Sequence, residues 1–161
     1  MRMNVFKLMP RLARRVSPAR IACLLLAMLP MTQARACWED AARLYGVNPE
    51  LLYAVAKTES QLNPRAVHRN ANGTRDIGLM QINSTWLPVL HKYGIDEQQL
   101  LDACTSIYVG AWIMADNMRR MGNSWQAVGA YNAANPVLRA SYALKVYKNL
   151  PSTALGTPAA Q

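Results

Sequence analysis

Two Asn-Pro pairs, Asn48-Pro49 and Asn135-Pro136, constrain the fold of this chain more than any other local feature. Asparagine is a strong helix cap, and proline suits the first position of a helix because its missing N–H would have no helical partner there. The first pair predicts a helix that ends before Asn63-Pro64, and the second predicts a last helix that ends at about Leu150. Apolar residues recur at helical spacing almost throughout residues 37–150, and no sustained alternation predicts strands. The chain is therefore expected to be mostly α-helical.

Polar turns divide the rest of residues 37–150 into further helices and one irregular region. Residues 64–77 contain Asn72-Gly73 and no apolar period, which indicates a loop or a small irregular hairpin. The other expected helices run from about Trp38 to Tyr45, from a Ser84 cap to Leu90, from an Asp102 cap to about Met121, and from a Ser124 cap through Tyr131.

Residues 1–36 have the composition of a secretory signal peptide. A basic stretch precedes a short apolar run over residues 21–31, and Ala34-Arg35-Ala36 forms an A-x-A cleavage site. An uncleaved membrane anchor is the alternative, but the run is too short to cross ~30 Å of hydrocarbon easily, and Pro30 interrupts it. Lipid modification of Cys37 is disfavoured because Arg35 occupies a position where that signal requires a small residue. We expect export to the periplasm, with no stable membrane insertion after cleavage.

The basic charge of the chain is concentrated in this leader. The formal net charge is +9, but seven of the 18 basic residues lie before Cys37, where no acid occurs. The remaining 11 basic and 9 acidic residues leave only +2. A nearly balanced domain does not favour nucleic acid as a partner.

Removal of the leader leaves two cysteines, Cys37 and Cys104. In an oxidising compartment such a pair predicts a disulfide that joins the mature N-terminus to the middle of the chain. Two buried thiols are the alternative. His68 and His91 are 23 residues apart with no ligand-spaced partner, so no metal site is expected.

Glu59 is a lone acid on the apolar side of its predicted helix. Val55 precedes it by four positions and Leu52 by seven, so the three side chains share one stripe. Desolvation and the negative end of the helix dipole both disfavour the anion, and its pKa should rise from ~4.3 towards neutrality. These features predict a general acid.

Four short motifs follow in order along the chain: Glu59-Ser60, Gly78-Leu79-Met80-Gln81, Ala130-Tyr131-Asn132-Ala133, and Tyr142 with Val146. In this order they resemble the soluble lytic transglycosylase family. The resemblance implies a lysozyme-like fold of the goose-lysozyme or SLT type, a single helical domain with a small loop-rich or short β region. It covers residues 37–150, and the small and polar residues 151–161 are expected to form a disordered tail. One departure is Ala134, which stands where the family usually has glycine.

The resemblance also implies an activity that needs no cofactor. Such enzymes cleave peptidoglycan between N-acetylmuramic acid and N-acetylglucosamine and leave a 1,6-anhydro end. Glu59 would first protonate the glycosidic oxygen and then, as a carboxylate, take the proton of the C6 hydroxyl.

The other motif residues are expected to bind substrate or support the acid. Ser60 would support the setting of the acid, and Met80 and Gln81 would contact the substrate where Gly78 lets the backbone approach it closely. Tyr131 and Asn132 would border the cleft from one helix. Tyr142, which is preferred to Tyr147 because of its spacing to Val146, would hydrogen-bond near the acid.

Two rival functions remain open. A muramidase would use water and a second acid near Glu59. Asp76 is the next acid along the chain after Glu59 and lies just before the second motif. We expect its side chain on the loop surface or in an ion pair with an arginine. A non-catalytic peptidoglycan-binding component of a secretion apparatus would bind glycan and release nothing. The small size resembles the specialised members that open the wall for secretion, conjugation or pilus machines, and components of such a machine are the expected protein partners.

Overall fold

The computed structural model describes residues 29–152, with side chains from residue 36 onward. The chain divides into a short unit, Met1–Thr32, and a main unit, Gln33–Gln161, which carries the elements discussed below except for the first four residues of the helix that begins at Leu29. Most of the expected signal peptide, and the expected tail beyond Ser152, lie outside the described residues. No helix within residues 29–152 is long and apolar enough to span a membrane.

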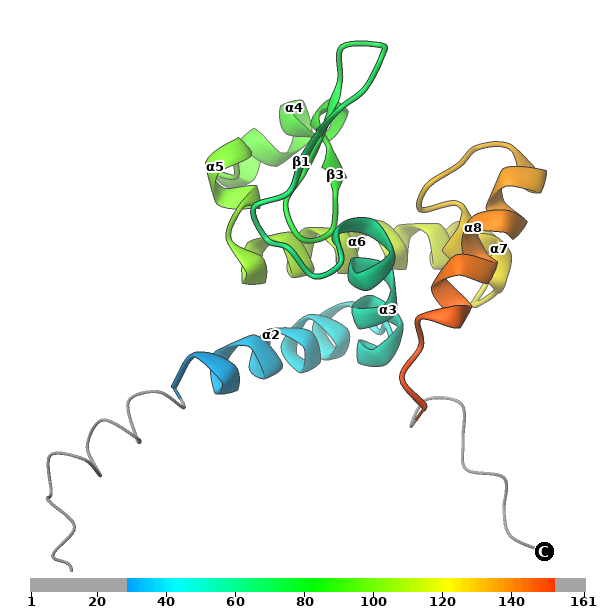
Figure 1. Cartoon of the computed structure of the whole chain (residues 1–161), viewed down its shortest axis with the longest axis horizontal. Coiled ribbons are helices and arrows are strands. Elements are labelled where there is room, and N and C mark those ends of the chain that lie inside the picture. The colour runs from blue at the N-terminus through cyan, green and yellow to red at the C-terminus, as the bar shows by residue number, and fades with distance from the viewer. Residues whose placement is uncertain (1–28, 153–161) are drawn as a thin grey trace, which may run out of the picture. The chain divides into compact units, whose positions relative to one another are not determined.

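The described part of the chain is mostly helical, with one small sheet (Figure 1). The α-helices are α2 (Leu29–Tyr45), α3 (Pro49–Ser60), α4 (Leu87–Leu90), α5 (Glu97–Leu100), α6 (Ala103–Met121), α7 (Trp125–Gly129) and α8 (Pro136–Lys148), and two 3-10 turns are η1 (Ser84–Trp86) and η2 (His91–Tyr93). The strands are β1 (Val67–Arg69), β2 (Arg75–Ile77) and β3 (Ile82–Asn83). The predicted fold class is confirmed.

The Asn-Pro pairs begin helices as predicted. The Asn48 side chain accepts hydrogen bonds from the N–H groups of Glu50 and Leu51 at the start of α3. Asn135 caps α8 in the same way. Asp102 caps α6 by accepting from the N–H of Thr105 at 2.8 Å. Each cap satisfies amide donors that the first turn of a helix leaves unpaired.

Three local predictions were wrong in detail. Helix α2 begins at Leu29 rather than at Trp38, because helix-favouring alanines precede the apolar pattern. The cap before η1 is Asn83, which accepts from the N–H of Thr85, whereas the Ser84 hydroxyl accepts from a strand amide of β2. Helix α7 ends at Gly129, so Tyr131 lies in the turn that follows it and not on a helix.

The irregular region after α3 forms a hairpin and then a third strand. The order is β1-β2-β3, and both pairings are antiparallel. In this register Val67 lies opposite Ile77, and Asp76 lies opposite Asn83. The pairing brings together the polar side chains of Asn70, Thr74, Asp76 and Asn83, which hydrogen-bond to one another.

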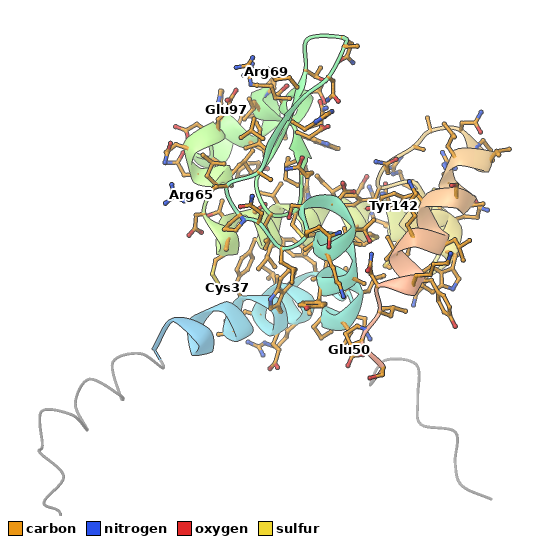
Figure 2. The ribbon with its side chains drawn as sticks, in the orientation of Figure 1. Cys37, Glu50, Arg65, Arg69, Glu97 and Tyr142 are labelled. Carbon is orange, nitrogen blue, oxygen red and sulfur yellow. A yellow bond between two sulfur atoms is a disulfide. The ribbon has the colours of Figure 1, made fainter. Side chains whose placement is uncertain are left out.

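Helices α3 and α6 supply the two largest shares of the buried interior. Leu52 and Val55 of α3 and Ile107 and Met114 of α6 are almost completely buried. A disulfide joins Cys37 of α2 to Cys104 in the first turn of α6 (Figure 2). Burial of this apolar interior and closure of the 67-residue separation both favour the folded state.

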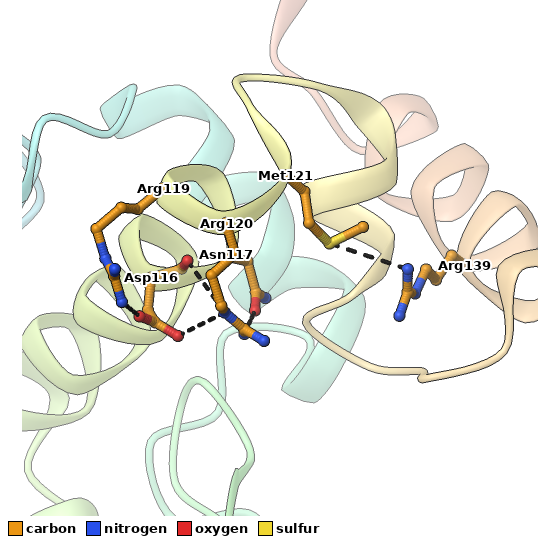
Figure 3. A network of polar contacts seen from close by, with 6 residues as sticks. All are labelled: Asp116, Asn117, Arg119, Arg120, Met121 and Arg139. Carbon is orange, nitrogen blue, oxygen red and sulfur yellow. Dashed lines mark hydrogen bonds and ion pairs between the residues drawn. The ribbon is translucent and has the colours of Figure 1, made fainter.

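The C-terminal end of α6 lies close to α8. Asp116 pairs with Arg119 and Arg120, and the Arg120 guanidinium donates to Asn117 (Figure 3). Arg139 of α8 points towards Met121 and donates to the carbonyl of Ala133 at 2.9 Å. These contacts hold the segment between α7 and α8 against the end of α6.

Candidate active site

Glu59 lies in the last turn of α3, on the stripe that Leu52 and Val55 continue into the core. Burial is the largest influence on its carboxyl group and raises its pKa from 4.5 to about 7. A hydrogen bond from Tyr142 lowers the pKa, the charge of Asp76 raises it, and the charge of Lys145 lowers it. The balance leaves a carboxylic acid that titrates near neutrality.

The end of α3 is fixed to the loop that follows the sheet hairpin. Ser60 donates from its hydroxyl to the carbonyl of Leu79 at 2.7 Å, and it accepts from the N–H of Asn63. Gln61 adopts the left-handed conformation, with φ of 54°, and ends the helix after Ser60, one residue beyond the acid. Ser60 therefore ties the acid's helix to the second motif and supports the site through backbone groups.

Tyr142 of α8 contacts the acid directly. Its hydroxyl donates a hydrogen bond to Oε1 of Glu59 at 2.5 Å, and the position of Tyr142 on α8 can be seen in Figure 2. Burial and the charge of Glu59 raise the pKa of Tyr142 well above its usual range, so the phenol stays protonated. Tyr147, the competing tyrosine, is exposed on the outer side of α8.

The second and third motifs meet at the backbone of Met80. The Tyr131 hydroxyl donates to the Met80 carbonyl at 3.1 Å, and the Met80 N–H donates to the Ser106 hydroxyl at 3.0 Å. Burial raises the pKa of Tyr131, which likewise remains a hydroxyl donor. The expected substrate contact of Met80 is wrong, because its side chain is fully buried and packs where Gly110 leaves room. Met80 supports the site from the core.

Gln81 lines the cavity, but its amide nitrogen bonds the protein. It donates to the carbonyls of Ala66 and Gly78, which brace the backbone around a positive φ of 48° at Gln81 itself. Gly78 also has a positive φ, and a Cβ there would lie 2.0 Å from the carbonyl oxygen of Leu100. The close approach expected at Gly78 is thus made to Leu100 and not to a ligand.

A cavity of about 380 Å³ opens in front of Glu59. Its wall is mostly amide, hydroxyl and carboxyl groups, with an indole and two aliphatic side chains: Glu59, Asn70, Asn72, Thr74, Asp76, Gln81, Ile82, Asn83, Trp86, Ile113, Tyr131 and Asn132. Neutral donors and acceptors beside an aromatic surface suit hydroxyl and acetamido groups better than a charged or purely apolar ligand.

Asp76 lies in this cavity, and its expected place on the loop surface or in an ion pair was wrong. Its two carboxyl oxygens accept from the side-chain amides of Asn83 at 2.7 Å and Asn70 at 2.9 Å. The neighbouring arginine, Arg75, pairs instead with Glu97 of α5. Asn70, Asn83 and Trp86 also line the cavity, and the sequence motifs did not predict this. The available signal for Asn83 is its position two residues after Gln81, the last residue of the second motif.

The remaining predictions concern Asn132 of the third motif and a metal site. Asn132 borders the cavity and is exposed, as expected for a residue at the cleft edge. Among residues with described side chains, no group of three or more His, Cys, Asp or Glu is arranged to hold a metal ion.

Comparisons with known proteins agree with this geometry. The family model described as the transglycosylase SLT domain matches residues 36–145. Invasion protein IagB of Salmonella typhimurium is 47% identical over 118 residues, which cover 70% of this chain and 74% of that protein. Protein IpgF of Shigella flexneri is 34% identical over 133 residues, covering 82% of this chain and 88% of that protein.

A solved structure has the same fold. An inactive mutant of the lytic transglycosylase Slt from Pseudomonas aeruginosa superposes with a TM-score of 0.54 at 24% identity, over 70% of this chain and 20% of that longer chain. The match of the family model to two thirds of the sequence, which contains the first three motifs and Tyr142 of the fourth, identifies the chain as a member of the transglycosylase SLT domain family and hence as a peptidoglycan lytic transglycosylase.

Proposed function

We propose that the cavity holds a peptidoglycan strand with the bond between N-acetylmuramic acid and N-acetylglucosamine at Glu59. The protonated carboxyl donates its proton to the glycosidic oxygen as the bond from that oxygen to C1 of N-acetylmuramic acid breaks. The N-acetylglucosamine side leaves as an alcohol. Glu59 is then a carboxylate beside a cationic sugar ring.

The second half of the reaction uses the same carboxylate as a base. It takes the proton of the C6 hydroxyl of the muramic acid, and the C6 oxygen forms a new bond to C1. The product is a 1,6-anhydro ring, no water is consumed, and Glu59 regains its proton for the next cycle. One carboxyl group serves both half-reactions, and no cofactor enters.

The observation that carries this proposal is the position of Glu59 in the cavity wall, where burial raises its pKa to about 7. A general acid and base is most effective when its pKa lies close to the working pH. The Tyr142 hydroxyl supports the carboxylate after proton transfer because its hydrogen bond favours the anion. Asn70, Gln81 and Asn132 line the cavity, and we expect their side-chain amide groups to bind the acetamido and hydroxyl groups of the sugars.

The test compares Glu59→Gln with Glu39→Gln, an exposed acid on α2 that serves as the matched control. Purified peptidoglycan is digested, and soluble muropeptides are identified by mass. Glu59→Gln should release no anhydro-muropeptides, whereas Glu39→Gln should release them at the wild-type rate. Undiminished release by folded Glu59→Gln would exclude Glu59 from the mechanism, and wild-type protein that binds the wall but releases nothing would indicate a non-catalytic binding module.

Asp76 favours one second candidate, a hydrolytic muramidase. It shares the cavity with Glu59, and its charge acts on the acid, so the cavity contains the two carboxyl groups that a hydrolytic reaction of this kind uses. Two asparagine amides hold it as an acceptor. Under this candidate, products would carry a reducing end and be heavier by one water, and Asp76→Asn would abolish their release.

We also propose that residues 1–36 export the protein to the periplasm, where it opens the wall locally for a secretion, conjugation or pilus machine. The support is the A-x-A site at residues 34–36 and the 47% identity to a protein named for invasion. A chromosomal Glu59→Gln exchange should impair one such machine while leaving growth normal. Unimpaired assembly of every candidate machine would count against this role.

A further inference from the structure

Helix α8 is apolar on two sides, and only one of them is covered. Tyr142, Ala143 and Val146 face inward and are buried. A second stripe has spacings of three, four and three residues: Val137, Ala140, Leu144 and Tyr147, all exposed. Val137 is 77% exposed, Leu144 54% and Tyr147 46%. Spacing of this kind is that of a seam between packed helices.

The stripe borders a hollow that extends onto α7. The rings of Trp125 and Tyr147 lie 5.5 Å apart, edge to face, and Trp125 is itself 46% exposed. Together with Ala140, Ala143 and Leu144 they surround a hollow of about 270 Å³. Exposed aromatic and aliphatic side chains grouped in this way are typical of a surface that binds another protein. None of these side chains lines the cavity at Glu59.

The charge around the stripe indicates the chemistry of the partner. Residues 122–161 contain three basic residues, Arg139, Lys145 and Lys148, and no Asp or Glu. Arg139 is directed inward to Ala133 and Met121 (Figure 3). Lys148 is exposed four positions after Leu144 and so lies at the edge of the stripe, whereas Lys145, also exposed, lies nearer to Tyr142, and its charge acts on Glu59. An acidic partner would complement this rim.

Two other occupants fit the charge less well. A second copy packed through its own α8 would place lysines against lysines, which is repulsive. The chain's own residues 153–161 offer Leu155 as their one large apolar side chain and contain no acid.

We propose that this surface, the α8 stripe with Trp125, docks an amphipathic helix of a partner protein whose apolar seam is flanked by acidic residues. The inner side of α8 contributes Tyr142 to the active site, and the outer side holds the partner. Because the docking surface and the catalytic cavity share no lining residue, the enzyme can be held in place by its partner while its cavity stays open to glycan. The inference is independent of which bond the enzyme cleaves.

The probe is a labelled synthetic helix of about three heptads with leucine at the seam and glutamate at the flanking positions. Its counterpart carries lysine in place of glutamate. Fluorescence anisotropy with protein expressed from the full sequence should show the glutamate helix binding at least about tenfold more tightly than the lysine helix. Lys148→Glu should weaken binding of the glutamate helix and strengthen binding of the lysine helix, a reversal that loss of folding cannot produce.

A matched pair of leucines tests the position of the surface. Leu144→Ser should weaken binding of the glutamate helix at least about tenfold. Leu138→Ser, 59% exposed on the same helix but away from the stripe, should leave binding within about twofold of wild type. Both variants should release muropeptides at the wild-type rate.

Four results would overturn the proposal. They are equal or absent binding of the two helices, equal effects of the two leucine variants, a concentration-dependent dimer that Leu144→Ser abolishes, and loss of binding to purified peptidoglycan in Leu144→Ser. The third would assign the surface to a second copy, and the fourth to glycan.

Discussion

Replacing Glu59 with glutamine should make the folded protein more stable at alkaline pH and change its stability little at acidic pH. Folding raises the pKa of this carboxyl from 4.5 to about 7 because burial disfavours its anion. Between these values the folded state retains a proton that the unfolded state has released, so wild-type stability falls as pH rises through this window. The full shift corresponds to roughly 3 kcal/mol of stability that the wild type lacks above pH 7.

Glutamine does not titrate, and its amide oxygen can still accept the hydrogen bond of Tyr142. Urea unfolding of wild type and Glu59→Gln at pH 4 and pH 8 should therefore show the advantage of the variant growing by roughly 3 kcal/mol between the two conditions. Glu39→Gln, at an exposed site, should show no such growth. An advantage of Glu59→Gln that is the same at both pH values would refute the claim that Glu59 is desolvated in the folded protein.

On purified peptidoglycan, kcat/KM should fall about tenfold per pH unit above about 7, because Glu59 must enter the reaction protonated; a rate that stays constant up to pH 9 contradicts this. Tyr142→Phe removes a hydrogen bond that lowers the pKa of Glu59, so the alkaline limb of the same profile should move to higher pH, and an unshifted limb would remove Tyr142 from that role. Gly78→Ala should destabilise the fold by about 3 kcal/mol in thermal denaturation, because φ at this position is positive and the new methyl group would clash with the Leu100 carbonyl. Gly73→Ala should cost only about 1 kcal/mol, because φ there is also positive but the methyl group would meet open space. Equal losses of stability in the two variants would contradict the assigned clash with Leu100.

The sequence was most informative where a local signal fixes a local structure. The caps at Asn48, Asp102 and Asn135 predicted three helix starts correctly, because each cap pairs with amides only two or three residues away. The stripe of Leu52 and Val55 predicted the burial of the acid for the same reason.

Tertiary contacts decided what the sequence left open. Strand β2, which carries Asp76, has three residues, and its partner β3 has two, so both are too short for an alternating pattern to show that the Asp76 side chain faces the cavity. Met80 is core because Gly110, thirty positions later, leaves room for it. Helix α7 has only five residues, so its end before Tyr131 has no periodic signal. The sequence does not distinguish the exposed stripe of α8 from the buried one, because both consist of apolar residues at helical spacing.

Digestion of peptidoglycan in water enriched in ¹⁸O tests the central claim most directly. If Glu59 alone serves both half-reactions and the C6 hydroxyl is the nucleophile, the released muropeptides will be anhydro forms that contain no ¹⁸O. Muropeptides that carry ¹⁸O at the reducing muramic acid would show that water attacks C1, and the account of a single carboxyl group acting as acid and then base on the sugar's own hydroxyl would be wrong.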